Sequence, residues 1–133
     1  MKQYAIKATA NNDLDVVEFD VTDSYDTIKE ATGGGTIQCI YLSELDVDMW
    51  IDDNGKLVNE PEINAFGSAL WVHSYGMTDI IVGDIIITGG VDDEGNTLGL
   101  NEEQVATVLK AANDTMRLVA VDAFSEENVT IVV

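Results

Sequence analysis

The stretch that decides the fold is residues 36–56, which read TIQCIYLSELDVDMWIDDNGK. The segments Thr36–Leu42 and Val47–Ile51 have the composition and alternation of β-strands. A turn at Asp53–Lys56 follows them, because an Asn-Gly pair accepts the positive φ angles of a tight hairpin. Strands joined by turns, without a regular alternation of strand and helix, favour an α+β fold.

Outward from this hairpin, the same signals predict strands on both sides. Asp79–Thr88 is either one bulged strand or two arms around a tight bend at Val82–Asp84. We therefore expect a mixed or mainly antiparallel sheet of six to eight strands. Besides the two central strands, the predicted strands are Gln3–Thr9, Val16–Val21, an arm starting at Leu57, Asp79–Thr88, Leu118–Ala123 and Val129–Val133.

Capping residues and helical spacing predict three helices. The first starts at Thr22–Ser24 and ends at the glycines 33–35, and the second starts at Asn59–Pro61 and ends at Gly76. The third, Asn101–Arg117, opens with Asn-Glu-Glu-Gln, which matches a capping box. Residues at helical spacing define one face of each helix: Tyr25, Ile28 and Ala31 in the first, and Ile63, Phe66, Leu70 and His73 in the second. In the third, the expected buried stripe is Val105, Val108, Leu109, Ala112 and Met116.

Composition and charge narrow the class of protein. The 133 residues suit one acidic α+β domain over residues 1–133, and 46 % hydrophobic residues suffice for a core. With 25 acidic and 6 basic residues, the net charge is -19. Such a field repels phosphate backbones and anionic membranes, so we expect no direct nucleic-acid binding and no membrane binding. Charged partners should be basic protein surfaces or cations.

The few reactive side chains argue against catalysis. Cys39 is the only cysteine and lies in an apolar run, where we expect it to be buried. A single cysteine cannot form a disulfide within the chain, which suits a reducing cytoplasm. Cys39 and the single histidine, His73, are too few for a zinc site, and no nucleophile motif is present. We predict no enzyme activity, metal or cofactor. Loose divalent-cation binding at Asp52 and Asp53 or at residues 92–94 stays open, as do carboxylate pairs for glycoside hydrolysis.

Two sets of side chains are candidates for binding. Along the strand Val47–Ile51, Asp46, Asp48 and Asp52 share one face, which predicts carboxylates about 6.5–7 Å apart, close to the phosphate spacing of one nucleic-acid strand. The same pattern is typical of an ordinary solvent face. The candidate partner-binding residues are Asp46, Asp48, Asp52 and Asp53. The candidate ligand-stacking residues, which are alternatively core or subunit-contact residues, are Trp50, Trp71 and Tyr75.

Four segments resemble a family of short uncharacterised proteins from phages, mobile elements and Gram-positive bacteria, classed as a domain of unknown function. They are Tyr25–Gly35, Met49–Leu57, Asn59–Trp71 and Asp79–Ile87. The likeness covers roughly residues 1–100 and leaves the helix Asn101–Arg117 outside it. It implies an α+β fold, a phage or plasmid context and the cytoplasm of a bacterial host, and it transfers no catalytic residue.

Our leading hypothesis is a non-enzymatic acidic binding protein of phage or mobile-element type. It would act as a nucleic-acid mimic that inhibits a host nuclease or defence complex by presenting carboxylates where phosphates bind. One alternative is a binding module for a small molecule or nucleotide signal. Another is a structural or assembly subunit, and homo-oligomerisation stays open.

Overall fold

The computed structural model describes residues 2–54 and 62–123, with side chains of the last helix described as far as Arg117. Its strands are β1 (Tyr4–Ala8), β2 (Leu14–Glu18), β3 (Ile37–Leu42), β4 (Val47–Asp52) and β5 (Ile85–Thr88). Its helices are the 3-10 helix η1 (Val21–Asp23), α1 (Ser24–Ala31), α2 (Ala65–Tyr75) and α3 (Glu102–Ala123). The α+β class and the three α-helices are confirmed.

One sheet forms the centre of the fold, with the strand order β2-β1-β5-β4-β3 and antiparallel pairing throughout. Over the described residues it has five strands, so the expectation of six to eight is wrong. Val82 forms only an isolated bridge with Ile63, because the chain bends at Gly83, where φ is 79°. The returning arm at Leu57 and the strand Val129–Val133 lie outside the described residues, as does the second half of the turn Asp53–Lys56.

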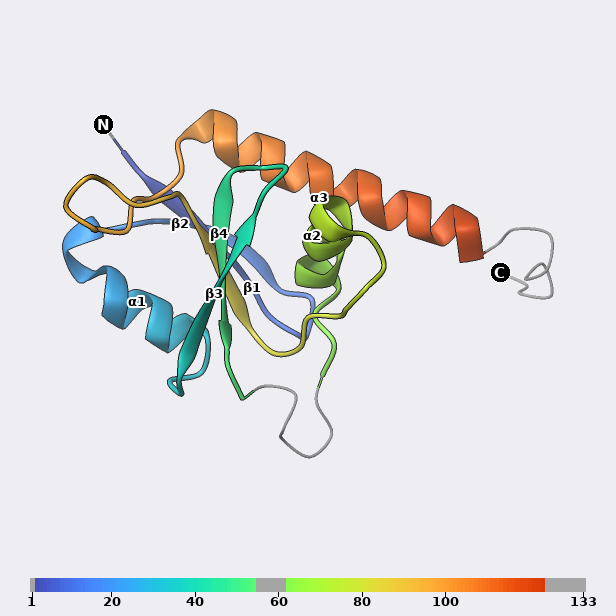
Figure 1. The fold of residues 1–133 in the computed structure, drawn as a ribbon, viewed down its shortest axis with the longest axis horizontal. Helices are drawn as coiled ribbons and strands as arrows, with labels where there is room; N and C mark the ends of the chain where they lie inside the picture. Colours follow the sequence, from blue (N-terminus) through green and yellow to red (C-terminus); the bar gives the residue numbers. More distant parts are fainter. Residues whose placement is uncertain (1, 55–61, 124–133) are drawn as a thin grey trace.

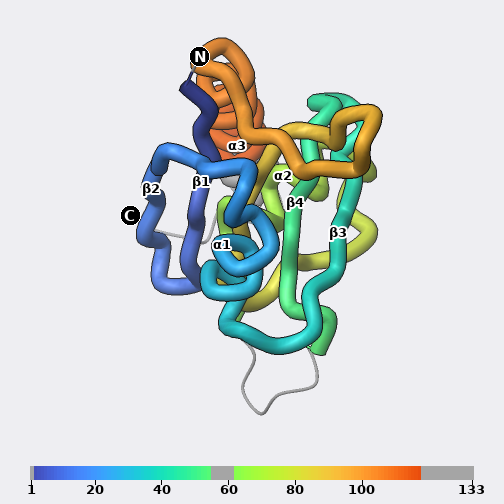
Figure 2. Tube along the Cα trace, turned by 90° about the vertical axis from the view of Figure 1, so that its left-hand side faces the viewer, coloured from blue at the N-terminus to red at the C-terminus, as the bar shows by residue number. Residues whose placement is uncertain are grey.

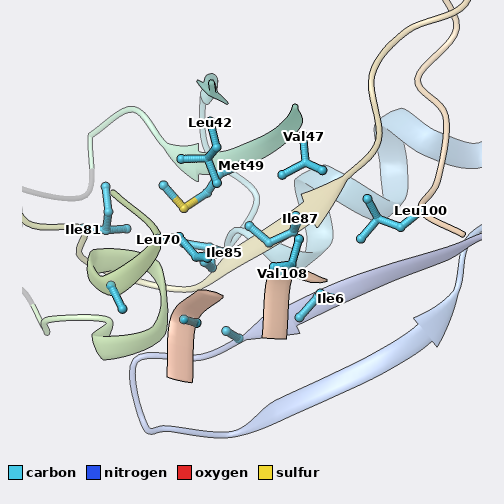
Figure 3. Close-up of a cluster of buried hydrophobic side chains, with 13 residues drawn as sticks. Ile6, Leu42, Val47, Met49, Leu70, Ile81, Ile85, Ile87, Leu100 and Val108 are labelled. Carbon is cyan, nitrogen blue, oxygen red and sulfur yellow. The ribbon is translucent and has the colours of Figure 1, made fainter. Parts of the chain in front are cut away.

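Helices cover both faces of this sheet (Figure 1). Helix α1 lies against one face, and α2 and α3 lie against the other; Figure 2 has α1 in front of the sheet. The strand β5 is buried along its whole length, as expected for a central strand covered on both sides. Ile86 belongs to the apolar cluster under α1, whereas Ile85 and Ile87 belong to the larger cluster under α2 and α3 (Figure 3).

Asn64 fixes the start of α2 and ties it to the sheet. Its side-chain oxygen accepts a hydrogen bond from the Gly67 amide at 2.8 Å, which is an N-cap. Its side-chain nitrogen donates to the carbonyl groups of Ala8 at 3.0 Å and Gly83 at 2.8 Å. The helix therefore begins at Ala65, and the predicted start at Asn59–Pro61 is wrong. Its predicted end at Gly76 is confirmed.

Helix α3 begins as predicted and continues further than predicted. The Asn101 amide donates to Gln104 Oε1 and the Gln104 amide donates to Asn101 Oδ1, each at 2.8 Å, so the capping box is present. The helix then continues to Ala123, and the predicted strand Leu118–Ala123 is wrong. No glycine or proline interrupts the segment, and an established helix gains one hydrogen bond with each further residue.

Candidate partner-binding site

The aspartates around β4 do not form the expected exposed row. Asp46 lies in the preceding turn with φ at 55°, which breaks the period-two alternation, and it accepts a hydrogen bond from the Tyr41 hydroxyl at 2.6 Å. Asp48 is only 9 % exposed, and its backbone lies between those of Tyr41 and Thr88 in the sheet. Asp52 is half-buried. Asp48 shares a face of β4 with Trp50, which packs in the apolar cluster under α1, so this face is not an open solvent face.

Asp48 and Cys39 share a polar contact on this face. Burial raises the pKa of Asp48, although its hydrogen bond with the Cys39 thiol opposes that increase. Partial burial and the Asp48 carboxylate together raise the pKa of Cys39 to about 12. Cys39 is exposed on the edge strand β3, which corrects the expectation that it is buried. A thiol with this pKa is protonated at neutral pH and is a poor nucleophile.

The sheet separates the three candidate stacking residues. Trp50 packs in the cluster under α1, and its indole nitrogen donates to Thr88 Oγ1 at 2.9 Å. Trp71 and Tyr75 lie on α2 with ring centroids 4.7 Å apart at an interplanar angle of 47°. The indole of Trp71 donates to Thr78 Oγ1 at 3.0 Å, and the Tyr75 hydroxyl donates to the backbone carbonyl of Tyr41. Only Trp71 and Tyr75 form an aromatic pair.

An acidic hollow of about 190 Å³ brings together three of the candidate residues. Asp52, Asp53 and Trp71 line it, along with Asp79, which sequence analysis did not single out. We call the hollow lined by these residues the acidic hollow. The backbone amide of Asp53 donates to the Thr36 carbonyl at 2.7 Å, so the end of β4 is held in the sheet. A planar or extended cation fits carboxylates beside an indole ring, through charge-assisted hydrogen bonds and cation–π contact.

An apolar groove of about 500 Å³ adjoins the acidic hollow along α2. Asp79 and Ile80 line both, so the two hollows are neighbours. The groove is lined by Ala65, Ser68, Ala69, Val72, Met77, Asp79, Ile80 and Met116. The sequence does not predict this groove, because Asp79–Thr88 has the pattern of a strand. The available signal was Met77 and Ile80, two large apolar residues directly after the glycine that ends the helix.

Little of the acidic charge is neutralised within the chain. Two ion pairs join described side chains, Lys2–Glu18 at 2.9 Å and Lys110–Asp114 at 2.6 Å. Their side chains are 44 % to 77 % exposed, so water and salt screen both pairs. Even if all 6 basic residues were paired, 19 of the 25 acids would keep their charge uncompensated. The protein therefore presents a strongly negative field to any partner.

Comparison with known proteins gives one family. The model of a family described as a domain of unknown function matches residues 1–113. This match confirms the resemblance to an uncharacterised family and extends it beyond residue 100, well into α3. No curated protein and no solved structure matches the chain.

Among the helices of the described residues, none is both long and apolar enough to cross a membrane. Within the same residues, no three His, Cys, Asp or Glu side chains form a group that could hold a metal ion.

Proposed function

The chain belongs to the family Domain of unknown function (DUF3846), and from this premise we propose that it is a non-enzymatic acidic binding protein whose partner is a basic protein surface. The observation that carries the proposal is the uncompensated charge of -19 on a folded chain. A field of this size accelerates encounter with a basic partner and repels acidic competitors. The association should be fast and should weaken as salt is added.

The acidic hollow is the part of the surface that best fits such a partner. Asp52 is the last residue of β4 and pairs with Ile37 of β3, and the amide of Asp53 donates to the Thr36 carbonyl, so the backbone positions of both aspartates are fixed before binding. Trp71 adds an aromatic surface to the same hollow. An arginine or lysine side chain of the partner would pair with the carboxylates and contact the indole ring. Asp46 and Asp48 contribute less, because Asp46 is engaged by Tyr41 and Asp48 is buried.

In its most specific form, the proposal is nucleic-acid mimicry. The carboxylates would occupy the phosphate positions in the groove of a host nuclease or defence enzyme, in the cytoplasm of a bacterial host and in a phage or mobile-element context. A groove that attracts about one phosphate charge per 1.7 Å of duplex axis also attracts a rigid acidic surface. The excess of 25 acids over 6 bases supports this form, because the chain has too few basic residues to neutralise its own carboxylates.

A second candidate function is small-molecule binding. The apolar groove of about 500 Å³ supports it, because ligand pockets typically measure about 300–1,000 Å³ and are largely apolar. The charge of the chain disfavours an anionic ligand such as a nucleotide, so a neutral or cationic molecule fits better.

The main proposal is tested by competition for a basic groove. Fluorescent duplex DNA is bound to each member of a panel of restriction endonucleases without their metal cofactor, and the protein is added at several salt concentrations. We expect displacement from at least one enzyme, which weakens between about 50 and about 500 mM salt. A protein that displaces DNA from no enzyme at the lowest salt would refute mimicry.

A charge-matched pair of variants locates the surface. Asp52→Asn with Asp53→Asn removes two charges from the acidic hollow, and Asp13→Asn with Asp15→Asn removes two from exposed positions in and beside β2. We expect the first variant to lose most of the displacement and the second to lose little. Equal losses would mean that only the total charge matters.

A thermal-shift screen of neutral and cationic molecules tests the second candidate function. A tight ligand at 100 times its Kd adds about 2.7 kcal/mol to the free energy of unfolding.

A further inference from the structure

The floor of the apolar groove is built from one face of α2. Ala65, Ser68, Ala69 and Val72 follow each other at the spacing of a single helix face, and three of the four are small. The hydroxyl of Ser68, the only polar side chain among them, accepts a hydrogen bond from the Ile81 amide at 2.9 Å and also lies 3.2 Å from the Ile81 carbonyl. The floor therefore presents apolar surface, and its small residues allow another backbone to approach closely.

The rim of the groove is large, apolar and exposed. Met77 is 75 % exposed, Ile80 45 % and Met116 38 %. Met77 and Ile80 come from the loop after α2, and Met116 comes from α3, so the rim has walls from two separate elements. Unbranched methionine side chains adapt to the shape of a bound apolar group. Exposed apolar side chains gathered in a hollow mark a binding surface more often than scattered ones do.

The neighbouring charge indicates what the groove holds. Ile80 and Asp79 line both the groove and the acidic hollow, so the two adjoin and carboxylates lie at one end of the groove. We propose that the apolar groove binds an amphipathic helix of the basic partner, with the apolar face of the helix in the groove and a lysine or arginine in the acidic hollow. The proposal rests on the proposed function, and it adds the structural form of the partner.

Charge and geometry favour this occupant over the others. A second copy of the chain would bring another net charge of -19 to the same surface. Its apolar contacts would have to overcome the repulsion between two negatively charged chains. A small neutral molecule would fill the groove without using the acidic hollow. A helix matches a groove bounded by α2 and α3, because helices pack through ridges and grooves and bind through anchors at i, i+3, i+4 and i+7.

The test uses a synthetic amphipathic helical peptide made of leucine and lysine. A scrambled peptide of the same composition, with no apolar face, has the same charge. The groove variant is Met77→Gln with Ile80→Gln. Its matched control is Leu14→Gln with Val16→Gln, an apolar pair on the edge strand β2 that is 50 % and 42 % exposed. Circular dichroism and melting temperature verify that each variant is folded, and fluorescence anisotropy measures the affinities.

We expect the wild-type protein to bind the amphipathic peptide at least about tenfold more tightly than the scrambled one. The groove variant should lose about tenfold for the amphipathic peptide and almost nothing for the scrambled one, and the β2 control should behave as wild type. If the groove variant binds the amphipathic peptide as wild type does, while Asp52→Asn with Asp53→Asn weakens binding, the groove inference is wrong and the proposed function stands.

Other outcomes separate the remaining occupants. If neither peptide binds the wild-type protein at low salt, the proposed function fails together with the inference. If a leucine–glutamine peptide with no charge binds more tightly than the leucine–lysine peptide, the groove takes an apolar ligand and the basic partner is wrong. A dimer in sedimentation analysis that Met77→Gln with Ile80→Gln converts to a monomer would assign the groove to a second copy.

Discussion

Replacing Asn64 by alanine removes three hydrogen bonds from the junction of α2, β1 and the loop before β5. The side chain of Asn64 is fully buried, so the groups left behind by Asn64→Ala have little access to water. The Gly67 amide loses its N-cap acceptor, which costs about 1 kcal/mol. The carbonyl groups of Ala8 and Gly83 lose their donor, at about 1 kcal/mol each.

We therefore expect Asn64→Ala to lower the free energy of unfolding by about 3 kcal/mol. A domain of this size typically has about 5–15 kcal/mol in total, so the loss is large but leaves a folded protein to measure. Urea unfolding followed by circular dichroism measures it, provided that the slope of free energy against urea is unchanged.

The control for this measurement is Asn101→Ala. Asn101 caps α3 through the Gln104 amide in an exposed position, so its loss should cost only the cap, about 1 kcal/mol. The difference of about 2 kcal/mol between the two variants reports the buried bonds to the sheet and to the loop. If Asn64→Ala costs no more than Asn101→Ala, those bonds contribute no net stability and the reasoning fails.

Three further predictions concern charge. Burial raises the pKa of Asp48 in the folded state above its unfolded value, so ionisation of Asp48 should lower stability as pH rises through these two pKa values. Asp48→Asn should therefore have a higher melting temperature than wild type at pH 7, and the difference should close near pH 4. A difference in melting temperature that does not change with pH would contradict this. Cys39, with a pKa of about 12, should react slowly with iodoacetamide at pH 7, and Asp48→Asn should speed the reaction; a rate equal to that of a free thiol would contradict the shift. Added salt up to about 0.5 M should raise the melting temperature, because screening weakens repulsion among 25 acids facing 6 bases; a flat profile would show that the charges are well paired.

Local signals predicted much of the fold. The strand boundaries of β1, β3 and β4 follow from alternation, and the start of α3 follows from its capping box, because these depend on residues close in sequence. The start of α2 could not be found this way, because Asn64 acts as a cap while bonded to Ala8, 56 residues away. The end of α3 was also missed, since its apolar residues after Arg117 suit a strand or a helix equally.

The candidate site was predicted only in part. Alternation correctly placed Asp48 and Asp52 on one face of β4, but it contains no information on whether a helix covers that face. The acidic hollow contains Asp52, Asp53 and Trp71, three residues named from sequence, together with Asp79, which was not. The apolar groove joins residues from α2, the loop after it and α3, and no short-range pattern predicts that these meet.

The central position of β5 sets an order for assembly as the chain leaves the ribosome. The two hairpins, β1–β2 and β3–β4, are complete by residue 52, yet the strand that joins them is made only at residues 85–88. Until then each hairpin exposes one unpaired inner edge, a form of β structure that tends to associate with other chains. The acidic side chains give every nascent chain the same sign of charge. Repulsion between chains therefore disfavours association at the unpaired edges until β5 is made and pairs with β1 and β4.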